Sequence, residues 1–109
     1  PIPINGQGMI QGIAGDNFNA YLGVPYAQAP IGDLRFSPPQ SPLPFNENVY
    51  IAKNIGPGCP QSSWEGIANQ TQSEDCLYLN IFTPRNNNIN STNQLYPVLL
   101  FIHGGGWIT

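Results

Sequence analysis

Apolar residues gather in two short segments near the start of the chain. Residues 8–13 and 18–24 are both rich in apolar side chains, and the polar sequence Gly-Asp-Asn at 15–17 separates them. Short apolar segments joined by a turn of glycine, aspartate and asparagine are typical of a β-hairpin. We therefore expect the two segments to pair as strands.

A clearer strand pattern lies between residues 76 and 82. Leu77, Leu79 and Ile81 alternate there with more polar or aromatic residues, which places the three aliphatic side chains on one face of an extended chain. Pro84 follows this pattern and is expected to end the strand, because proline cannot donate a hydrogen bond to a neighbour.

The most apolar run of the chain is Val-Leu-Leu-Phe-Ile at residues 98–102. A continuous apolar run of this length is typical of a strand that is buried on both faces. The Asn-rich segment 86–93 before it predicts a hydrated loop. Because about a dozen loop residues and no helix separate this run from 76–82, we expect the two strands to form an antiparallel pair.

The region between these strands is less regular. Segment 25–44 is dense in proline, which is incompatible with a helix or a central strand and predicts a long surface segment. Residues 46–58 have no clear pattern, and we predict no element there.

Composition indicates that the 109 residues do not form a self-sufficient unit. Glycine and proline contribute 12 residues each, and only 8% of the residues are charged, against about 25% in typical soluble domains. A helix is expected after an apolar strand and a glycine turn, and none follows here. We therefore expect residues 1–109 to be the incomplete N-terminal portion of a single larger α/β domain.

Charge and hydropathy exclude some classes of partner. A net charge of −3 without clustered lysine and arginine gives no electrostatic footprint for nucleic acid. No apolar run approaches the ~18 residues that suggest a membrane span. The chain opens at Pro1 without methionine, which is compatible with a leader that has been removed.

Cysteines and glycosylation sequons bear on the compartment. Cys59 and Cys76 are compatible with one disulfide or with two free buried thiols. Sequons begin at Asn69 and Asn90, in polar stretches that we expect to be exposed loops. An even number of cysteines together with loop sequons favours the secretory route and a secreted glycoprotein.

Three consecutive glycines, residues 104–106, follow the apolar run and stand between His103 and Trp107. Glycine amides can adopt positive φ and approach a substrate oxygen closely. A His-Gly-Gly-Gly motif supplies one oxyanion-hole donor in lipases and esterases. A simple tight turn is the alternative, whereas a phosphate cradle is disfavoured because no Gly-Lys-Ser/Thr sequence follows.

Three segments precede the glycine motif: residues 21–27, residues 34–36 (Leu-Arg-Phe) and residues 74–80 (Glu-Asp-Cys-Leu-Tyr-Leu-Asn). With the glycine motif they resemble the type-B carboxylesterase and cholinesterase family over nearly the whole chain. The resemblance implies the N-terminal part of an α/β-hydrolase fold, in which an antiparallel hairpin leads into the first strands of a mixed central sheet.

The resemblance also implies that the parent protein hydrolyses small-molecule carboxylic esters through a serine acyl-enzyme. In this family the backbone N–H groups at the positions of Gly105 and Gly106 bind the developing oxyanion, and Gly104 allows the turn. A third donor and the catalytic serine, acid and base lie beyond Thr109. The 109 residues alone are therefore expected to be inactive, with the remainder of the hydrolase domain as their partner. No cofactor and no metal is implied.

Two residue pairs follow from the same resemblance. The family's first disulfide matches Cys59 and Cys76, and an internal ion pair matches Arg35 and Glu74. We expect both charges to be desolvated, because Arg35 lies between Leu34 and Phe36 and Glu74 just precedes a strand that we expect to be buried. Two surface charges are the alternative. Asp75 is not expected to form an acid/base pair with Glu74, since adjacent strand residues point to opposite faces.

The remaining aromatic and imidazole side chains receive structural interpretations. His103 is the single histidine, and we interpret it as a loop-orienting residue, because the triad of these hydrolases runs serine, acid, histidine along the chain. Trp107 is equally compatible with an acyl-pocket wall and with core packing. Trp64 is compatible with a substrate contact from the disulfide loop, but we favour a role in packing that loop onto the body of the protein. Phe45 stands where the family usually has tryptophan, which keeps the apolar volume but removes an N–H donor.

A non-catalytic binding module is the competing hypothesis. The same fold serves in cholinesterase-like adhesion proteins, in which the triad is lost and the surface binds partners. A Gly-x-Ser-x-Gly sequence further along the parent chain would distinguish the two functions.

Overall fold

A computed structural model describes residues 1–45, 49–62, 71–85 and 95–106 of the chain. The regular elements are short strands and one turn of 3-10 helix. In chain order they are β1 (Ile2–Ile4), β2 (Gly8–Gln11), β3 (Ile13–Ala14), β4 (Phe18–Pro25), the 3-10 helix η1 (Gly32–Leu34), β5 (Val49–Ile51) and β6 (Tyr78–Pro84).

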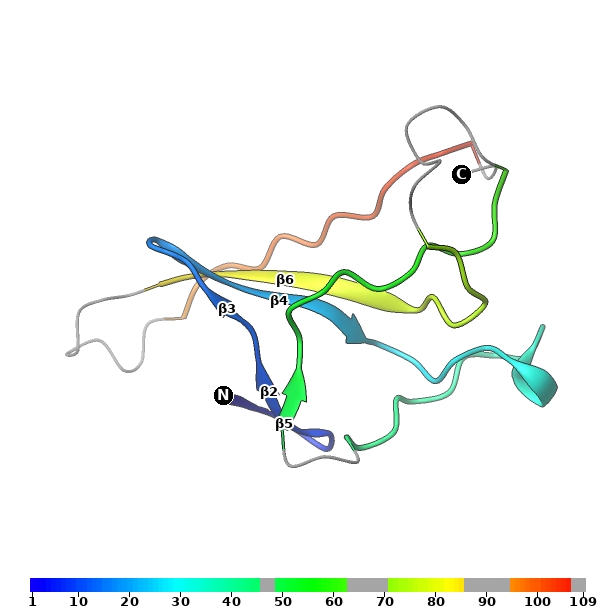
Figure 1. Cartoon of the computed structure of the whole chain (residues 1–109), viewed down its shortest axis with the longest axis horizontal. Helices are drawn as coiled ribbons and strands as arrows, with labels where there is room; N and C mark the ends of the chain where they lie inside the picture. Colours follow the sequence, from blue (N-terminus) through cyan, green and yellow to red (C-terminus); the bar gives the residue numbers. More distant parts are fainter. Residues whose placement is uncertain (46–48, 63–70, 86–94, 107–109) are drawn as a thin grey trace.

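The strands form two sheets of three strands each (Figure 1). In the first sheet β2 lies between β1 and β5, antiparallel to β1 and parallel to β5. In the second sheet β4 lies between β3 and β6, and both pairings are antiparallel. The described strands therefore include parallel and antiparallel pairs, in agreement with the expected mixed sheet.

The N-terminal hairpin is confirmed, with one modification. β3 and β4 pair with Ile13 opposite Ala20, and the turn closes through a 2.8 Å hydrogen bond from the Gly15 N–H to the Phe18 carbonyl. The first predicted segment is divided at Gly12, so that β2 joins one sheet and β3 the other. A Cβ at Gly12 would meet the Ala20 carbonyl oxygen, which explains why the chain crosses β4 at a glycine.

Strand β6 shows the alternation expected from the sequence, but it begins two residues later. Leu79 and Ile81 pack against the core, whereas Asn80 and Phe82 are exposed. The strand extends to Pro84, as expected for an edge position where no N–H donor is needed.

A bulge interrupts the pairing of β4 with β6 between Tyr21 and Val24. Gly23 lies inside it with φ of 65°, and a Cβ at this position would meet the carbonyl oxygen of Asn54. The Gly23 N–H donates to Oδ1 of Asn80 over 3.0 Å. Its carbonyl accepts a 2.7 Å hydrogen bond from the Tyr50 hydroxyl.

The hydrophobic core is small and lies where the two sheets meet. It contains the buried residues Ile10, Tyr21, Val24 and Ala52, with Ile4, Phe45, Tyr50, Leu79 and Ile81 packed against them. The Phe45 ring stacks on the Tyr50 ring with centroids 4.6 Å apart. Phe45 thus supplies apolar volume without needing the indole donor that it lacks.

The prediction of a buried strand at residues 98–102 is wrong for the described chain. These residues form no regular element, and Val98, Leu99 and Phe101 are 93%, 94% and 84% exposed. The predicted antiparallel pairing with 76–82 is also absent, because among the described residues β6 pairs only with β4. Apolar character shows that these side chains favour burial, but a strand also needs a neighbour that supplies hydrogen bonds.

In the remaining segments the structure confirms one prediction and contains two strands that were not predicted. Pro25 ends β4, and the rest of segment 25–44 contains only the short η1 turn and otherwise runs without regular structure. β1 and β5 were not predicted, since each has three residues and too little pattern to detect.

Replacing Asn80 tests the side-chain support of the bulge. Asn80→Ala leaves the Gly23 N–H without its acceptor and is expected to lower the free energy of unfolding by about 1 kcal/mol. Asn80→Asp keeps a side-chain oxygen at the same position and is the matched control. Urea denaturation at neutral pH measures both, and equal stability of wild type and Asn80→Ala would show that the contact contributes nothing.

Candidate active site

The glycine motif forms a turn whose geometry only glycine accommodates well. Gly105 has φ of 150° and Gly106 has φ of 61°, both in the range that side chains rarely adopt. Gly104 has no positive φ, and a Cβ there would meet no atom within 4 Å. The expectation that Gly104 allows the turn is therefore corrected, because the unusual backbone belongs to the two glycines after it.

His103 contacts the same turn. Its Nδ1 lies 2.7 Å from the Gly104 carbonyl oxygen, and both residues are exposed. A carbonyl oxygen only accepts hydrogen bonds, so Nδ1 carries the proton in this arrangement. The ring therefore acts on the backbone of its own loop, which fits the interpretation of His103 as loop-orienting.

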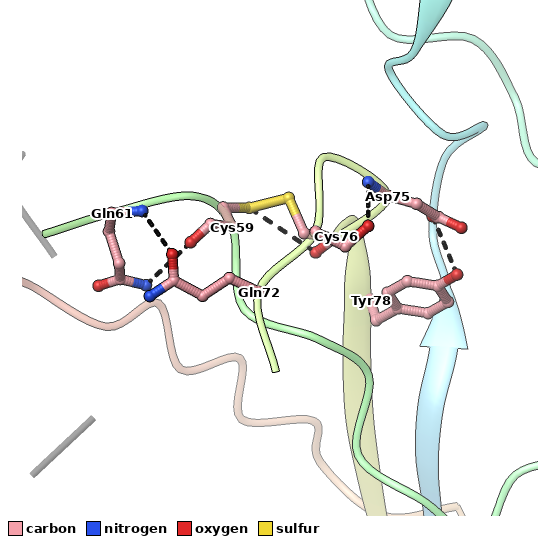
Figure 2. Close-up of a disulfide and its surroundings, with 7 residues drawn as sticks. Cys59, Gln61, Gln72, Asp75, Cys76 and Tyr78 are labelled. Atoms are coloured by element: carbon pink, nitrogen blue, oxygen red, sulfur yellow. Dashed lines mark hydrogen bonds between the residues drawn. A yellow bond between two sulfur atoms is a disulfide. The ribbon is translucent and has the colours of Figure 1, made fainter. Parts of the chain in front are cut away.

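The disulfide joins Cys59 to Cys76 and closes the base of a loop (Figure 2). The sequence separation is 17 positions, for which loop closure stabilises a folded chain by about 3 kcal/mol in the chain-entropy model. The two limbs of the loop also bond beside the sulfurs, because the Gln61 N–H donates to Oε1 of Gln72 over 3.1 Å. Within the first limb, the Gln61 side-chain amide donates to the Cys59 carbonyl over 3.2 Å.

The structure brings Arg35 and Glu74 together, with Nη2 of the arginine 2.7 Å from Oε1 of the glutamate. Their side chains are 52% and 47% exposed, so the expectation that both charges are desolvated is wrong for this chain. Apolar neighbours in sequence do not bury a long charged side chain whose end reaches water. The Arg35 guanidinium also lies 5.4 Å from the ring centroid of Phe36, which is 99% exposed and has φ of 58°.

Asp75 makes a contact that sequence reasoning missed. Its Oδ1 accepts a 2.9 Å hydrogen bond from the Tyr78 hydroxyl (Figure 2). Its N–H donates to the Ser73 hydroxyl over 3.1 Å. Because Glu74 pairs with Arg35 instead, the adjacent carboxylates have separate partners. The spacing of three residues between Asp75 and Tyr78 is the signal that could have indicated this contact.

The Asp75 carboxylate and partial burial alter the acidity of two tyrosines. Burial, followed by the hydrogen bond and the negative charge of Asp75, raises the pKa of Tyr78 to about 12. Burial and the Asp75 charge also raise the pKa of Tyr50. Both hydroxyls therefore remain protonated donors at neutral pH, Tyr78 to Asp75 and Tyr50 to Gly23.

Several residues singled out in the sequence lie outside the described part of the chain. They are Trp64, Asn69, Asn90 and Trp107. Within the described part, no group of three or more histidine, cysteine, aspartate or glutamate side chains could hold a metal ion. No helix among the described residues is long and apolar enough to cross a membrane.

Comparison with solved structures gives the class of protein, because the described strands correspond to the N-terminal part of an α/β-hydrolase fold. A solved structure of a thermophilic pNB esterase superposes with a TM-score of 0.78 at 35% identity, over 92% of this chain and 20% of that one. The sequence profile of the carboxylesterase family matches residues 2–109, and the chain belongs to this family.

Curated relatives agree with this assignment. Carboxylesterase 1F of Mus musculus is 39% identical over 115 residues, which cover 94% of this chain and 19% of the relative. Juvenile hormone esterase of Tribolium castaneum is 40% identical over 95 residues, which cover 84% of this chain and 15% of the relative. The chain thus spans no more than about a fifth of the length of these relatives.

The acidity of Tyr78 can be measured by absorbance at 295 nm, where tyrosinate absorbs. The difference between wild type and Tyr78→Phe is expected to titrate near pH 12, about two units above an ordinary tyrosine. Because the folded pKa is raised, the stabilising contribution of Tyr78 is complete below pH 10 and is lost as the pH rises from about 10 to 12. A midpoint near pH 10 in folded protein would contradict the Asp75 contact.

A double-mutant cycle tests the exposure of the ion pair. Glu74→Gln, Arg35→Gln and the double variant are expected to give a coupling energy of about 0.2–1 kcal/mol, since water screens half-exposed charges. The coupling should fall in 1 M salt, where the screening length is about 3 Å. A coupling of about 3 kcal/mol or more, insensitive to salt, would indicate a buried pair instead.

Proposed function

We propose that the protein carrying this chain hydrolyses carboxylic esters through a serine acyl-enzyme, and that residues 1–109 belong to one hydrolase domain. The observation that carries the proposal is the turn at Gly105 and Gly106, whose left-handed backbone lies at the end of an apolar run. Membership of the carboxylesterase family and relatives named as esterases support it.

The chemistry assigns a specific role to the turn. A serine oxygen attacks the ester carbonyl while a histidine removes its proton, and the carbonyl oxygen becomes an oxyanion. The N–H groups of Gly105 and Gly106 donate to this oxyanion, each contributing about 2.7–4 kcal/mol to transition-state stabilisation. The C–O bond then breaks, the alcohol leaves with the proton, and water hydrolyses the acyl-enzyme to the acid. The serine, acid and base come from outside these 109 residues.

The exposed apolar run is the proposed contact with the rest of the domain. Leu95 and residues 98–102 are each between 74% and 95% exposed, which is an unusual accumulation of aliphatic and aromatic surface. In the proposed domain these side chains are covered by further elements of the same domain, which the 109 residues do not supply.

We assign the protein to the secretory route. The disulfide between Cys59 and Cys76 supports this assignment, because such bonds persist in oxidising compartments and are rare in the cytosol. Asn69 and Asn90 are the proposed glycosylation sites, since each begins an Asn-x-Ser/Thr sequence.

The oxyanion role is tested by Gly106→Ala in the complete protein. An alanine at φ of 61° must shift the backbone, which misplaces one N–H donor, and kcat is expected to fall by about 10²–10³-fold. Gly104→Ala is the matched control in the same turn and should cost far less, because its Cβ has open space and its φ is not positive. Near-normal turnover of folded Gly106→Ala would remove the oxyanion role.

A fluorophosphonate probe separates the enzyme from a binding module. Covalent labelling of the wild-type protein is expected if an activated serine is present. Folded wild-type protein that is not labelled would favour the adhesion or binding function.

A further inference from the structure

We propose that Asn5 is a site of spontaneous modification, at which the Gly6 nitrogen attacks the Asn5 side chain and water converts it to aspartate and isoaspartate. We further propose that isoaspartate at this position loosens the hairpin of β1 and β2. Asn5 and Gly6 lie in the turn between these strands, and both residues are exposed. No other asparagine in the sequence is followed by glycine.

The turn leaves the reacting nitrogen accessible. Its closing hydrogen bond runs 3.1 Å from the Gln7 N–H to the Ile4 carbonyl, so Asn5 and Gly6 are the two central residues and the Gly6 N–H takes no part in the closure. Gly6 has φ of 77°, the value that the second central residue takes in a type II turn and that favours glycine. A Cβ at Gly6 would meet nothing within 4 Å, so no neighbouring segment covers the turn there.

The reaction needs only these two residues and water. The Gly6 nitrogen loses its proton to solvent and attacks Cγ of Asn5, which forms a cyclic imide. The bond from Cγ to Nδ2 breaks, and Nδ2 takes up a proton and leaves as ammonia. Water then opens the ring at Cγ to give aspartate, or at the main-chain carbonyl carbon of residue 5 to give isoaspartate. The net change is the hydrolysis of one amide, without oxidation or reduction.

The chain contains an internal reference for this reaction. Asn54 is exposed like Asn5, but Ile55 follows it. A β-branched side chain next to the attacking nitrogen is bulky and restricts rotation, whereas glycine does neither. Asn54 is therefore expected to react much more slowly than Asn5 in the same molecule.

The two products affect the hairpin differently. Aspartate adds one negative charge and leaves the main chain unchanged. Isoaspartate continues the main chain through Cβ and Cγ, so the turn becomes longer by one atom. The pairing of Ile4 with Gly8 and the hydrogen bond that closes the turn both depend on the original length.

A change in the turn also reaches the core. The Gln7 carbonyl accepts a 2.8 Å hydrogen bond from the Phe45 N–H, and the Phe45 ring stacks on Tyr50. Gln7 is the last residue before β2 and donates the hydrogen bond that closes the turn. A lengthened turn displaces Gln7 and therefore weakens the link between the hairpin and the aromatic pair.

The rate of modification is measured on the folded wild-type protein in its complete form. The protein is incubated at mildly alkaline pH, samples are digested at intervals, and peptides that contain residues 5 and 54 are analysed by mass spectrometry. Asn5 is expected to lose its amide at least about tenfold faster than Asn54, a difference of about 1.4 kcal/mol in activation free energy. Loss of the Asn5 amide no faster than that of Asn54 would overturn the proposal.

Hydrogen exchange of the aged protein tests the effect on the hairpin. Chromatography separates peptides that carry asparagine, aspartate or isoaspartate at residue 5, so deuterium uptake is measured for each form in one sample. Amides of β1 and β2 are expected to exchange about fivefold faster in the isoaspartate form, the factor of one neutral hydrogen bond. Freshly prepared Asn5→Asp is the matched control, which adds the charge alone and should exchange like wild type. Equal exchange in the asparagine and isoaspartate forms would overturn the proposed loosening.

Discussion

The fold depends on the two hydrogen bonds that hold Gly23 at the bulge of β4. The Gly23 N–H donates to the Asn80 side chain on β6 and the Gly23 carbonyl accepts from the Tyr50 hydroxyl on β5, so three strands from both sheets meet at one residue. The backbone adds to this junction, because the N–H of Leu22 donates to Ala52 over 2.9 Å. A bulge normally leaves polar backbone groups without partners, and here two side chains take the place of the missing sheet partners.

The position of β6 determines where the charged and sulfur-containing residues before it lie. Cys76 is anchored by its disulfide and Tyr78 is held by Asp75, so the chain enters the strand with little freedom. Glu74 is thereby presented to Arg35, which lies in the segment after β4. Residues 74–78 thus link the disulfide loop, the ion pair and the sheet through a covalent bond, a charge pair and a hydrogen bond.

Local features could be predicted from the sequence and long-range ones could not. The turn at 15–17 and the alternation around Leu79 and Ile81 depend on neighbouring residues, and both appear in the structure. The split at Gly12 and the parallel pairing of β2 with β5 depend on distant partners. Residues 98–102 show the limit most clearly, because apolar character does not reveal whether a neighbouring strand exists.

In the candidate site, too, some features could be predicted from the sequence and others could not. The unusual backbone of Gly105 and Gly106 could be anticipated from glycine itself, but a catalytic role came only from the family resemblance. The resemblance also suggested the partner of Arg35, whereas the exposure of that pair depends on side-chain direction. The contact of Asp75 with Tyr78 spans three residues and was within reach of sequence reasoning.

The separation of 57 residues between Gly23 and Asn80 has a consequence for biosynthesis. β4 leaves the ribosome long before β6, and at synthesis rates of about 5–20 residues per second it waits several seconds without that partner. Pairings between distant segments form slowly because loop closure must precede them. During that interval the edge of β4 that later pairs with β6 has no partner strand and is open to pairing with other nascent chains.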